Sequence, residues 1–270
     1  MPVSNLETAR APYQPLWNLR GEPEQTIFTI EGLAGDATVF QPIRDNKRWE
    51  PHVVAVLERI IQPDFVCLDV GANIGAITLP MAHLASSGHV YAFEASPTAY
   101  ELLQRNIAGN GLKNATAVNA AITDHSGDKA EIFWSDQALG CAHMADQAGH
   151  RTGTREEVRT LALDDYGFRL DRVDFIKMDV EGGEAAALAG CRRLLKEYRP
   201  PMIIEYNPAP MEAYNSKPRR ELYDVLTALY PRIEIITFPH GILDPVPDWE
   251  HLDQALHTHT YCDLLCTHPD

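Results

Sequence analysis

Short apolar segments that alternate with helical stretches constrain the fold more than any other feature of this sequence. The alternation begins near residue 65, and helical patterns lie near residues 77–85, 97–109, 184–198 and 219–230. The apolar segments predict seven strands, at residues 65–70, 90–93, 115–122, 173–178, 202–206, 233–238 and 261–266. Short apolar strands that alternate with helices are typical of a parallel sheet covered on both faces. The sequence therefore predicts an α/β fold.

The first 50 residues precede this alternation and differ from it. Residues 1–50 are polar and contain many prolines and glycines, and the segments 26–30 and 37–40 predict a β-hairpin within them. Apolar residues at helical spacing then predict a helix over residues 49–61. We therefore divide the chain into an N-terminal extension, residues 1–50, and a main domain, residues 51–270.

Two stretches of the main domain break the alternation. Residues 135–160 are polar and glycine-rich, and residues 239–260 contain three prolines. We expect both to be loops over a ligand site rather than core. In an open α/β sheet the ligand lies outside the carboxyl ends of the strands. The residues that directly follow each predicted strand are therefore the candidates for function.

The charge of the chain argues against anionic partners. Its 270 residues include 23 Lys and Arg against 38 Asp and Glu, which gives a formal net charge of −15. Phosphate backbones and anionic lipids repel such a protein, so we expect neither nucleic-acid binding nor membrane-surface binding. The sequence shows no signal-peptide run and no segment of membrane-spanning length, which predicts a cytoplasmic protein. Five scattered cysteines support neither a zinc site nor a disulfide framework, and a homo-oligomeric state stays open.

A glycine turn follows the first predicted strand, in the segment Asp69-Val70-Gly71-Ala72-Asn73-Ile74-Gly75. Gly71 allows a tight turn close to a ligand, and Gly75 allows the next helix to pack closely. The dinucleotide fingerprint G-x-G-x-x-G has its middle glycine where this chain has Asn73. Asp69 is a poor neighbour for a phosphate group but a good one for an ammonium group. The turn therefore favours a ligand that carries an ammonium group over a pyrophosphate, although a plain strand–helix connection is the alternative.

Glu94 ends the second predicted strand, 25 residues after Asp69. A carboxylate at this place can accept hydrogen bonds from both hydroxyls of a ribose. The alternative is an acidic residue that only stabilises the start of the following helix. Because the glycine turn precedes it, we favour ribose binding.

Five segments, VCLDVGANIGAITL, YAFEASP, VNAAITDHSG, DFIKMDVEGGE and MIIEY, together resemble the FkbM-type S-adenosylmethionine-dependent methyltransferases. The resemblance covers roughly residues 45–240, in the order and spacing of that family. It implies a Rossmann-like class I methyltransferase fold, whose seven-stranded, mostly parallel sheet has helices on both faces and an antiparallel last strand.

The resemblance also implies which residues bind S-adenosylmethionine. Residues of the glycine turn would line its methionine part, Glu94 would bind the ribose, and Asn119 or Asp124 would bind the adenine amine. The full set implied for the cofactor is Glu50, Asp69, Gly71, Ala72, Asn73, Gly75, Glu94, Ala95, Ser96, Asn119, Ala120, Ala121, Asp124 and Asp179.

Acidic residues follow the fourth and fifth predicted strands. Asp179 would face the sulfonium, Lys177 and Glu181 lie two residues to either side of it, and Glu205 ends the neighbouring strand. We predict that these side chains converge, and that Asp179, Glu181, Glu205 or His52 accepts a proton from the methyl acceptor. The alternative is a lysine–carboxylate network that only stabilises the sheet end. Three carboxylates can also hold a divalent metal, but Lys177 among them argues against one, so we expect no metal.

These features predict an S-adenosylmethionine-dependent methyltransferase that acts on oxygen of a small molecule or a sugar-type hydroxyl. One alternative is a nucleotide-dependent oxidoreductase, against which the absent middle glycine counts. The other is a non-catalytic module that binds a cofactor or a partner on the same fold. The motifs belong to the cofactor half of the site and do not identify the acceptor.

Overall fold

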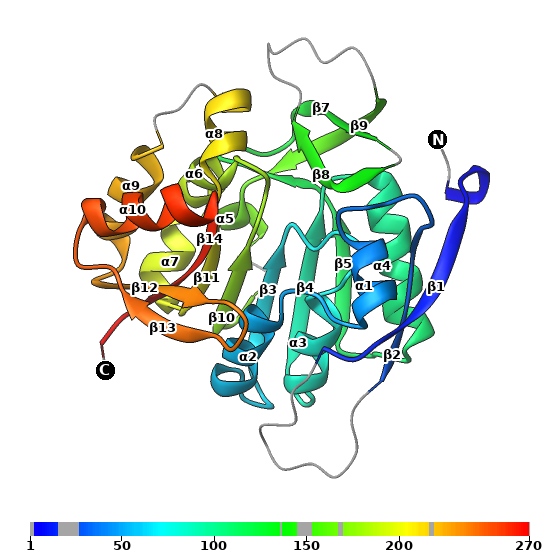
Figure 1. The fold of residues 1–270 in the computed structure, drawn as a ribbon, viewed down its shortest axis with the longest axis horizontal. Coiled ribbons are helices and arrows are strands. Elements are labelled where there is room, and N and C mark those ends of the chain that lie inside the picture. The colour runs from blue at the N-terminus through cyan, green and yellow to red at the C-terminus, as the bar shows by residue number, and fades with distance from the viewer. Residues whose placement is uncertain are drawn as a thin grey trace.

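An eight-stranded sheet forms the centre of the computed structural model, which describes residues 3–15, 27–135, 137–144, 153–166, 170–215 and 219–269. The strand order is β13-β12-β14-β11-β10-β3-β4-β5 (Figure 1). The bounds are β3 Val66–Val70, β4 His89–Glu94, β5 Ala115–Asn119, β10 Phe175–Met178, β11 Met202–Tyr206, β12 Arg232–Thr237, β13 Ile242–Pro245 and β14 Cys262–Thr267. The strands from β5 to β11 run parallel, and β14 is antiparallel to both of its neighbours. The predicted fold is confirmed, with β13 as an additional edge strand.

Helices cover both faces of this sheet because successive strand residues point to opposite sides. Phe175 and Ile203 pack with α2 and α3 on one face, whereas Ile176 and Ile204 pack with α6, α7 and α9 on the other. The bounds are α2 Pro51–Ile60, α3 Thr78–Leu84, α4 Pro97–Gly109, α5 Leu163–Tyr166, α6 Glu184–Ala189, α7 Arg192–Tyr198, α8 Pro208–Asn215, α9 Glu221–Leu229 and α10 Trp249–His259. None of the helices in the described residues combines the length and apolar character that a membrane span requires.

The N-terminal extension forms a different strand pair from the predicted one. It contains η1 (Val3–Asn5), β1 (Thr8–Tyr13), β2 (Phe28–Leu33) and α1 (Phe40–Asn46), and β1 pairs antiparallel with β2. The prediction of a strand at residues 37–40 is wrong. The Asp36 carboxylate accepts hydrogen bonds from the backbone N–H groups of Thr38 (3.0 Å) and Phe40 (3.1 Å), which turns the chain into α1 instead.

This extension shares its core with the main domain. Tyr13 is fully buried and its hydroxyl donates to the Ala76 carbonyl at 2.6 Å. Phe40 packs in the same apolar cluster as Leu79 of α3 and Leu102 of α4. Residues before 50 therefore cover the two helices that follow the first two strands of the main sheet.

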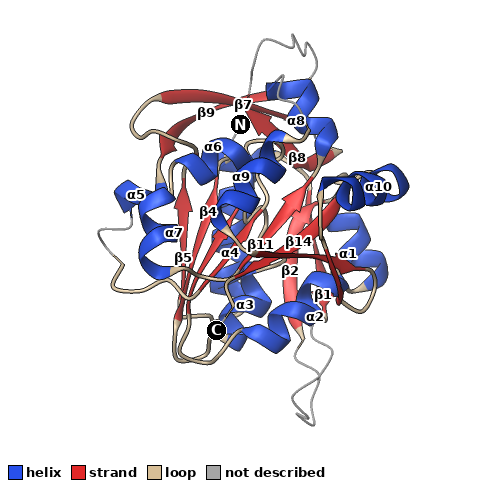
Figure 2. Ribbon diagram, turned by 90° about the vertical axis from the view of Figure 1, so that its left-hand side faces the viewer, coloured by secondary structure: helices blue, strands red, loops and turns tan. Residues whose placement is uncertain are grey.

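Residues 135–160, expected to be a loop, belong largely to a second sheet. Strands β6 (Ala121–Ile122), β7 (Lys129–Ser135), β8 (Ala138–Met144) and β9 (Thr154–Leu161) form four strands in the order β6-β9-β7-β8. This sheet lies beyond the carboxyl ends of β3 and β4 (Figures 1 and 2). The loop prediction is wrong here because polar residues, Glu156 and Thr160, occupy buried positions of β9 and hide its alternating pattern.

Two further expectations are corrected. Residues 239–260 are not a loop but contain β13 and α10, whose start is capped by Asp248 through the His251 N–H at 2.9 Å. The single helix predicted over 184–198 is two helices, α6 and α7. The break lies at Gly190, where a Cβ atom would lie 1.9 Å from the Thr123 carbonyl oxygen, so the chain bends where it contacts this carbonyl.

Candidate active site

A cavity of about 350 Å³ lies at the carboxyl ends of β3, β4, β10 and β11, where the sheet topology predicts a ligand site. Its volume is at the lower end of the range of small-molecule sites. Twelve of the predicted site residues line it, namely Glu50, Gly71, Ala72, Asn73, Glu94, Ala95, Ala120, Ala121, Lys177, Asp179, Glu181 and Glu205. The structure thus brings together residues that the sequence separates by more than 150 positions.

Gly71 turns the chain at one wall of the cavity. Its φ is +84°, and a Cβ atom at this position would lie 1.6 Å from the backbone oxygen of Asp179. The close approach that requires glycine is therefore a contact between the loops after β3 and β10. This contact fixes Asp179 relative to the first turn.

Glu94 connects the first turn to the second. One of its oxygens accepts the Asn73 N–H and the other accepts the Ser96 N–H, both at 2.7 Å. Burial raises the pKa of Glu94 to about 7 despite these two donors, with added repulsion from Asp69 and Asp179. Since each carboxylate oxygen can accept a second hydrogen bond, Glu94 can still bind two hydroxyl groups of a ligand.

Strand register explains why charged groups meet at the other end of the cavity. Lys177 of β10 lies opposite Asp69 of β3, and Glu205 of β11 lies opposite Asp263 of β14. The buried Lys177 ammonium contacts a carboxylate oxygen of Asp179 at 2.8 Å. Burial alone would lower the pKa of Lys177, but the surrounding carboxylates raise it above its usual value, so the ammonium stays charged.

The carboxylates that line this end are destabilised as anions. Burial, followed by the charges of neighbouring carboxylates, raises the pKa of Glu181 to about 9 and that of Glu205 well above its usual value. Burial and neighbouring carboxylates also raise the pKa of Glu50 to about 8, although Lys177 opposes the shift. One oxygen each of Glu50 and Glu205 is buried without a hydrogen-bond partner in the part of the chain that the structure describes. A cationic ligand would reduce the repulsion among these carboxylates and would contact their unpaired oxygens.

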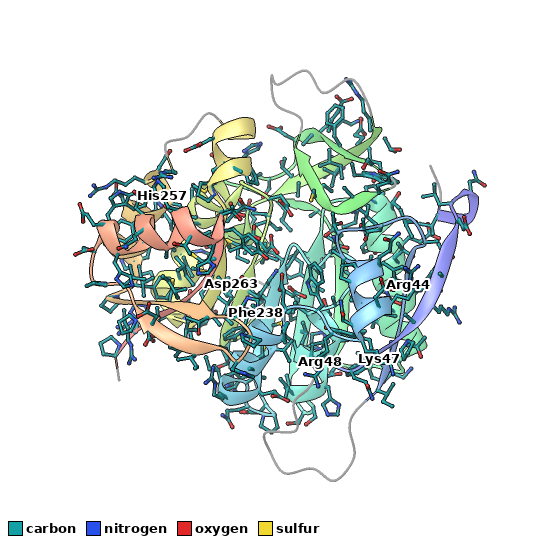
Figure 3. The ribbon with its side chains drawn as sticks, in the orientation of Figure 1. Arg44, Lys47, Arg48, Phe238, His257 and Asp263 are labelled. Carbon is teal, nitrogen blue, oxygen red and sulfur yellow. The ribbon has the colours of Figure 1, made fainter. Side chains whose placement is uncertain are left out.

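Asp69, Gly75 and His52 are predicted site residues that do not line the cavity. Asp69 is buried behind it and accepts a hydrogen bond from Thr78 at 2.5 Å, while Gly75 lies against α4. His52 contacts the Asp263 carboxylate at 2.8 Å and is therefore placed to orient Asp263 rather than to contact a ligand. Asp263 lies on the half of the molecule that carries β14 (Figure 3), away from the basic side chains of Arg44, Lys47 and Arg48.

Ser96, Asn119 and Asp124 also lie outside the cavity lining. Ser96 caps α4 and donates to Glu156 of the second sheet at 2.6 Å. The Asn119 amide donates to the carbonyls of Glu94 and Ala95, both at 2.9 Å, and so stabilises the turn after β4. Asp124 is exposed and contacts His125 at 2.6 Å, so the structure does not bring it to a ligand in this cavity.

Several residues that line the cavity were not identified from the sequence. Residues 38–39 of the extension and 139–142 of β8, which we call the cover, lie over the cavity and are joined by a hydrogen bond from the Gly140 N–H to the Thr38 hydroxyl at 3.0 Å. No motif marks the cover in the sequence. Asn207 and Tyr261 also line the cavity. Asn207 directly follows β11, so inspection of strand ends could have found it.

Comparison with known proteins identifies the kind of site. The family model described as the methyltransferase FkbM domain matches residues 69–261 of this chain. The 2-O-methyltransferase NoeI of Sinorhizobium fredii is 27% identical over 206 residues, which span 70% of this chain and 80% of that protein. The 31-O-demethyl-FK506 methyltransferase FkbM of Streptomyces tacrolimicus is 32% identical over 117 residues, which span 43% of this chain but only 42% of that protein.

A solved structure supports the fold independently. The 16S rRNA methyltransferase RsmC of T. thermophilus, determined with AdoMet and guanosine, superposes with a TM-score of 0.50 at 14% identity. The superposition covers 97% of this chain and 51% of that one. At this identity the likeness concerns the fold alone.

Proposed function

The chain belongs to the family of methyltransferase FkbM domains, and from this premise we propose that it transfers the methyl group of S-adenosylmethionine to a hydroxyl oxygen of a small molecule. The two relatives described above are named as O-methyltransferases, which favours oxygen as the acceptor atom. The observation that carries the proposal is one cavity with Glu94 at one end and a group of carboxylates around Lys177 at the other.

The residues present fit this cofactor. Glu94 lines the cavity with capacity for two further hydrogen bonds, which supports ribose binding, and the small side chains of Ala95, Ala120 and Ala121 in the same lining are compatible with a flat ring. When bound, S-adenosylmethionine supplies a methyl group on a cationic sulfur. The unpartnered oxygen of Glu50 and the carboxylate of Asp179 suit the cofactor's ammonium and sulfonium charges.

Carboxylates in the lining of the cavity can accept the proton that the acceptor hydroxyl loses. Asp179 is held by Lys177, whereas Glu181 and Glu205 line the cavity outside that ion pair. We infer that Glu181 or Glu205 accepts the proton, because the cationic cofactor, once bound, favours the anionic carboxylate that a general base requires. The cover encloses the cavity from the side of the extension, which favours a small acceptor.

The alternative functions are less well supported by the site. A dinucleotide would bring an anionic pyrophosphate into a cavity lined by Glu50, Glu94, Asp179, Glu181 and Glu205, and these acidic residues disfavour it. A non-catalytic module would not need proton-accepting carboxylates beside the reacting end of the cofactor. We therefore favour neither the oxidoreductase nor the binding module.

Cofactor choice gives the first prediction. S-adenosylhomocysteine at 100 times its Kd should stabilise the fold by about 2.7 kcal/mol. For a domain of this size that corresponds to a rise in Tm of about 5–10 °C. NAD⁺ at the same concentration should leave Tm unchanged. Calorimetric titration with both ligands checks the result, and binding of NAD⁺ alone would overturn the proposed function.

The pH dependence of cofactor binding gives the second prediction. Hydroxyl groups donate best to ionised Glu94, whose pKa of about 7 is above the usual 4.5. S-adenosylhomocysteine should therefore bind several-fold more tightly at pH 8 than at pH 6. Because the folded-state pKa is raised, the ligand-free fold loses stability as pH rises from about 4.5 to about 7, and the ligand restores part of it.

A Glu94→Gln variant is the control for this titration. Glutamine can still accept the N–H of Asn73 or Ser96, but it does not titrate. Its affinity should be at least about tenfold lower at pH 8, a loss of about 1.4 kcal/mol, with a smaller dependence on pH. An unchanged affinity and pH profile in a folded variant would assign Glu94 to the structure of the turns alone.

A further inference from the structure

Three carboxylates converge beside the cavity, and one of them, Glu184, was not a predicted site residue. One carboxylate oxygen from each of Asp179, Glu184 and Glu205 lies within 4.8 Å of the other two. Asp179 and Glu205 line the cavity, and Glu184, at the start of α6, lies behind them. The three side chains come from the ends of two adjacent parallel strands and from the helix that follows the first of them.

Two of these carboxylates are buried with an acceptor oxygen unused. Glu184 is only 1% exposed, and its Oε1 accepts the N–H groups of Val180 at 3.0 Å and Gly182 at 3.3 Å, which fixes the carboxylate in place. Its Oε2 is buried without a hydrogen-bond partner among the described residues. Glu205 is 9% exposed, and its Oε2 is also buried without a hydrogen-bond partner among the described residues. Unsatisfied buried acceptors are costly, so this pair points to a site for a cation.

We propose that Asp179, Glu184 and Glu205 bind one divalent cation of the Mg²⁺, Mn²⁺ or Ca²⁺ class. These hard cations take carboxylate oxygens as ligands. Two oxygens on opposite sides of a Ca²⁺ ion are about 4.6–5.2 Å apart, and about 4.0–4.2 Å apart for Mg²⁺. The oxygens of the three residues, within 4.8 Å of one another, can therefore surround one ion with little movement.

Lys177, which argued against a metal in the sequence, is paired with only one oxygen of Asp179. Its ammonium contacts Oδ2 of Asp179, which leaves Oδ1 of the same carboxylate outside that ion pair. Glu50 and Asp69 also lie close enough to Lys177 to raise its pKa, so the lysine is surrounded by more than one acidic group. A dication and the ammonium together would balance this excess of carboxylates better than the lysine alone.

The role of the ion, unlike its binding, rests on the proposed function. At the margin of the cavity it would favour loss of the proton from the acceptor hydroxyl. With Glu205 engaged as a ligand, Glu181 is left to accept that proton. The hydroxyl O–H bond then breaks as the new O–C bond forms, while the S–C bond breaks and its electron pair stays on sulfur.

Direct titration of metal into the full chain tests the site. Protein treated with a chelator and desalted should bind one equivalent of Mn²⁺, Mg²⁺ or Ca²⁺ in isothermal calorimetry. Glu184→Gln and Glu205→Gln should each weaken the Kd at least tenfold. Glu234→Gln is the matched control, because Glu234 is a buried glutamate of the same sheet that is paired with Arg232 at 2.7 Å, and its Kd should not change.

Two outcomes would overturn the metal site. The proposal fails if none of the three cations binds saturably by about 10 mM, which lies above the weakest protein calcium sites. It also fails if both glutamine variants, folded by circular dichroism, keep the wild-type Kd. Titration of S-adenosylhomocysteine into the same samples separates the two ideas. Cofactor binding without metal binding overturns the metal site alone, and metal binding without cofactor binding overturns the proposed function alone.

Discussion

Replacing Glu181 by glutamine is expected to slow methyl transfer by about 10²–10⁴-fold, the usual contribution of a general base. The amide keeps the shape of the side chain but does not accept a proton. S-adenosylhomocysteine should bind the variant nearly as well as the wild type, because the groups at the ribose end are unchanged. Initial rates with labelled S-adenosylmethionine check this, on an acceptor first found by screening hydroxylated small molecules.

Two further variants control this experiment. Glu205→Gln should also lose activity, but added Mn²⁺ should restore part of it, whereas Glu181→Gln should not respond to metal. Glu157→Gln changes an exposed glutamate of β9 that pairs with Lys129, and its rate should match the wild type. Full activity in both Glu181→Gln and Glu205→Gln would show that neither residue is the base and would direct attention to the cover.

Replacing Gly71 by alanine is expected to destabilise the fold strongly. The left-handed backbone costs an L-residue about 1–2 kcal/mol. The new Cβ atom would also lie 1.6 Å from the Asp179 backbone oxygen, and overpacking of this kind costs about 1–3 kcal/mol. The sum predicts a Tm lower by about 5 °C or more. Thermal unfolding measures this effect, and S-adenosylhomocysteine affinity should fall with it because Asp179 is displaced.

Gly127 provides a matched control for the backbone contribution. Its φ is +95°, close to that of Gly71, but a Cβ atom there would meet nothing within 4 Å. Gly127→Ala should therefore lose only the backbone contribution of about 1–2 kcal/mol. Equal losses in the two variants would show that the contact between the loops after β3 and β10 contributes little to stability.

The central strands of the main sheet could be predicted from the sequence because they are buried on both faces. Segments such as Val66–Val70 and Met202–Tyr206 are apolar except for one acidic residue each, Asp69 and Glu205, near the carboxyl end, and this pattern indicates short buried strands. The same pattern also indicated where a ligand cavity lies. Parallel strands bring their carboxyl ends to one edge, and Glu94, Asp179 and Glu205 lie at or just after those ends.

The remaining structure depends on contacts that no local pattern records. Strand β1 pairs with β2, which lies further along the chain than a tight hairpin would place it. Residues 37–40 have the composition of a strand, but the hydrogen bonds to Asp36 make them the start of a helix. Glu156 is buried in β9 because Ser96, Thr98 and Trp134 all donate to it, an arrangement that the sequence does not show. Glu184 likewise resembles an ordinary helix-start acid until its neighbours are seen.

The cover also has a consequence for how the chain reaches its fold. The hydrogen bond between Thr38 and Gly140 joins residues that are 102 positions apart. Contacts of such long sequence separation close slowly, because the entropy of the intervening chain opposes them. During synthesis the strand pair of β1 and β2 is made well before the surface it will cover. We expect apolar side chains of the extension, among them Tyr13 and Phe40, to stay exposed in the nascent chain until α3 and α4, against which they pack, have emerged.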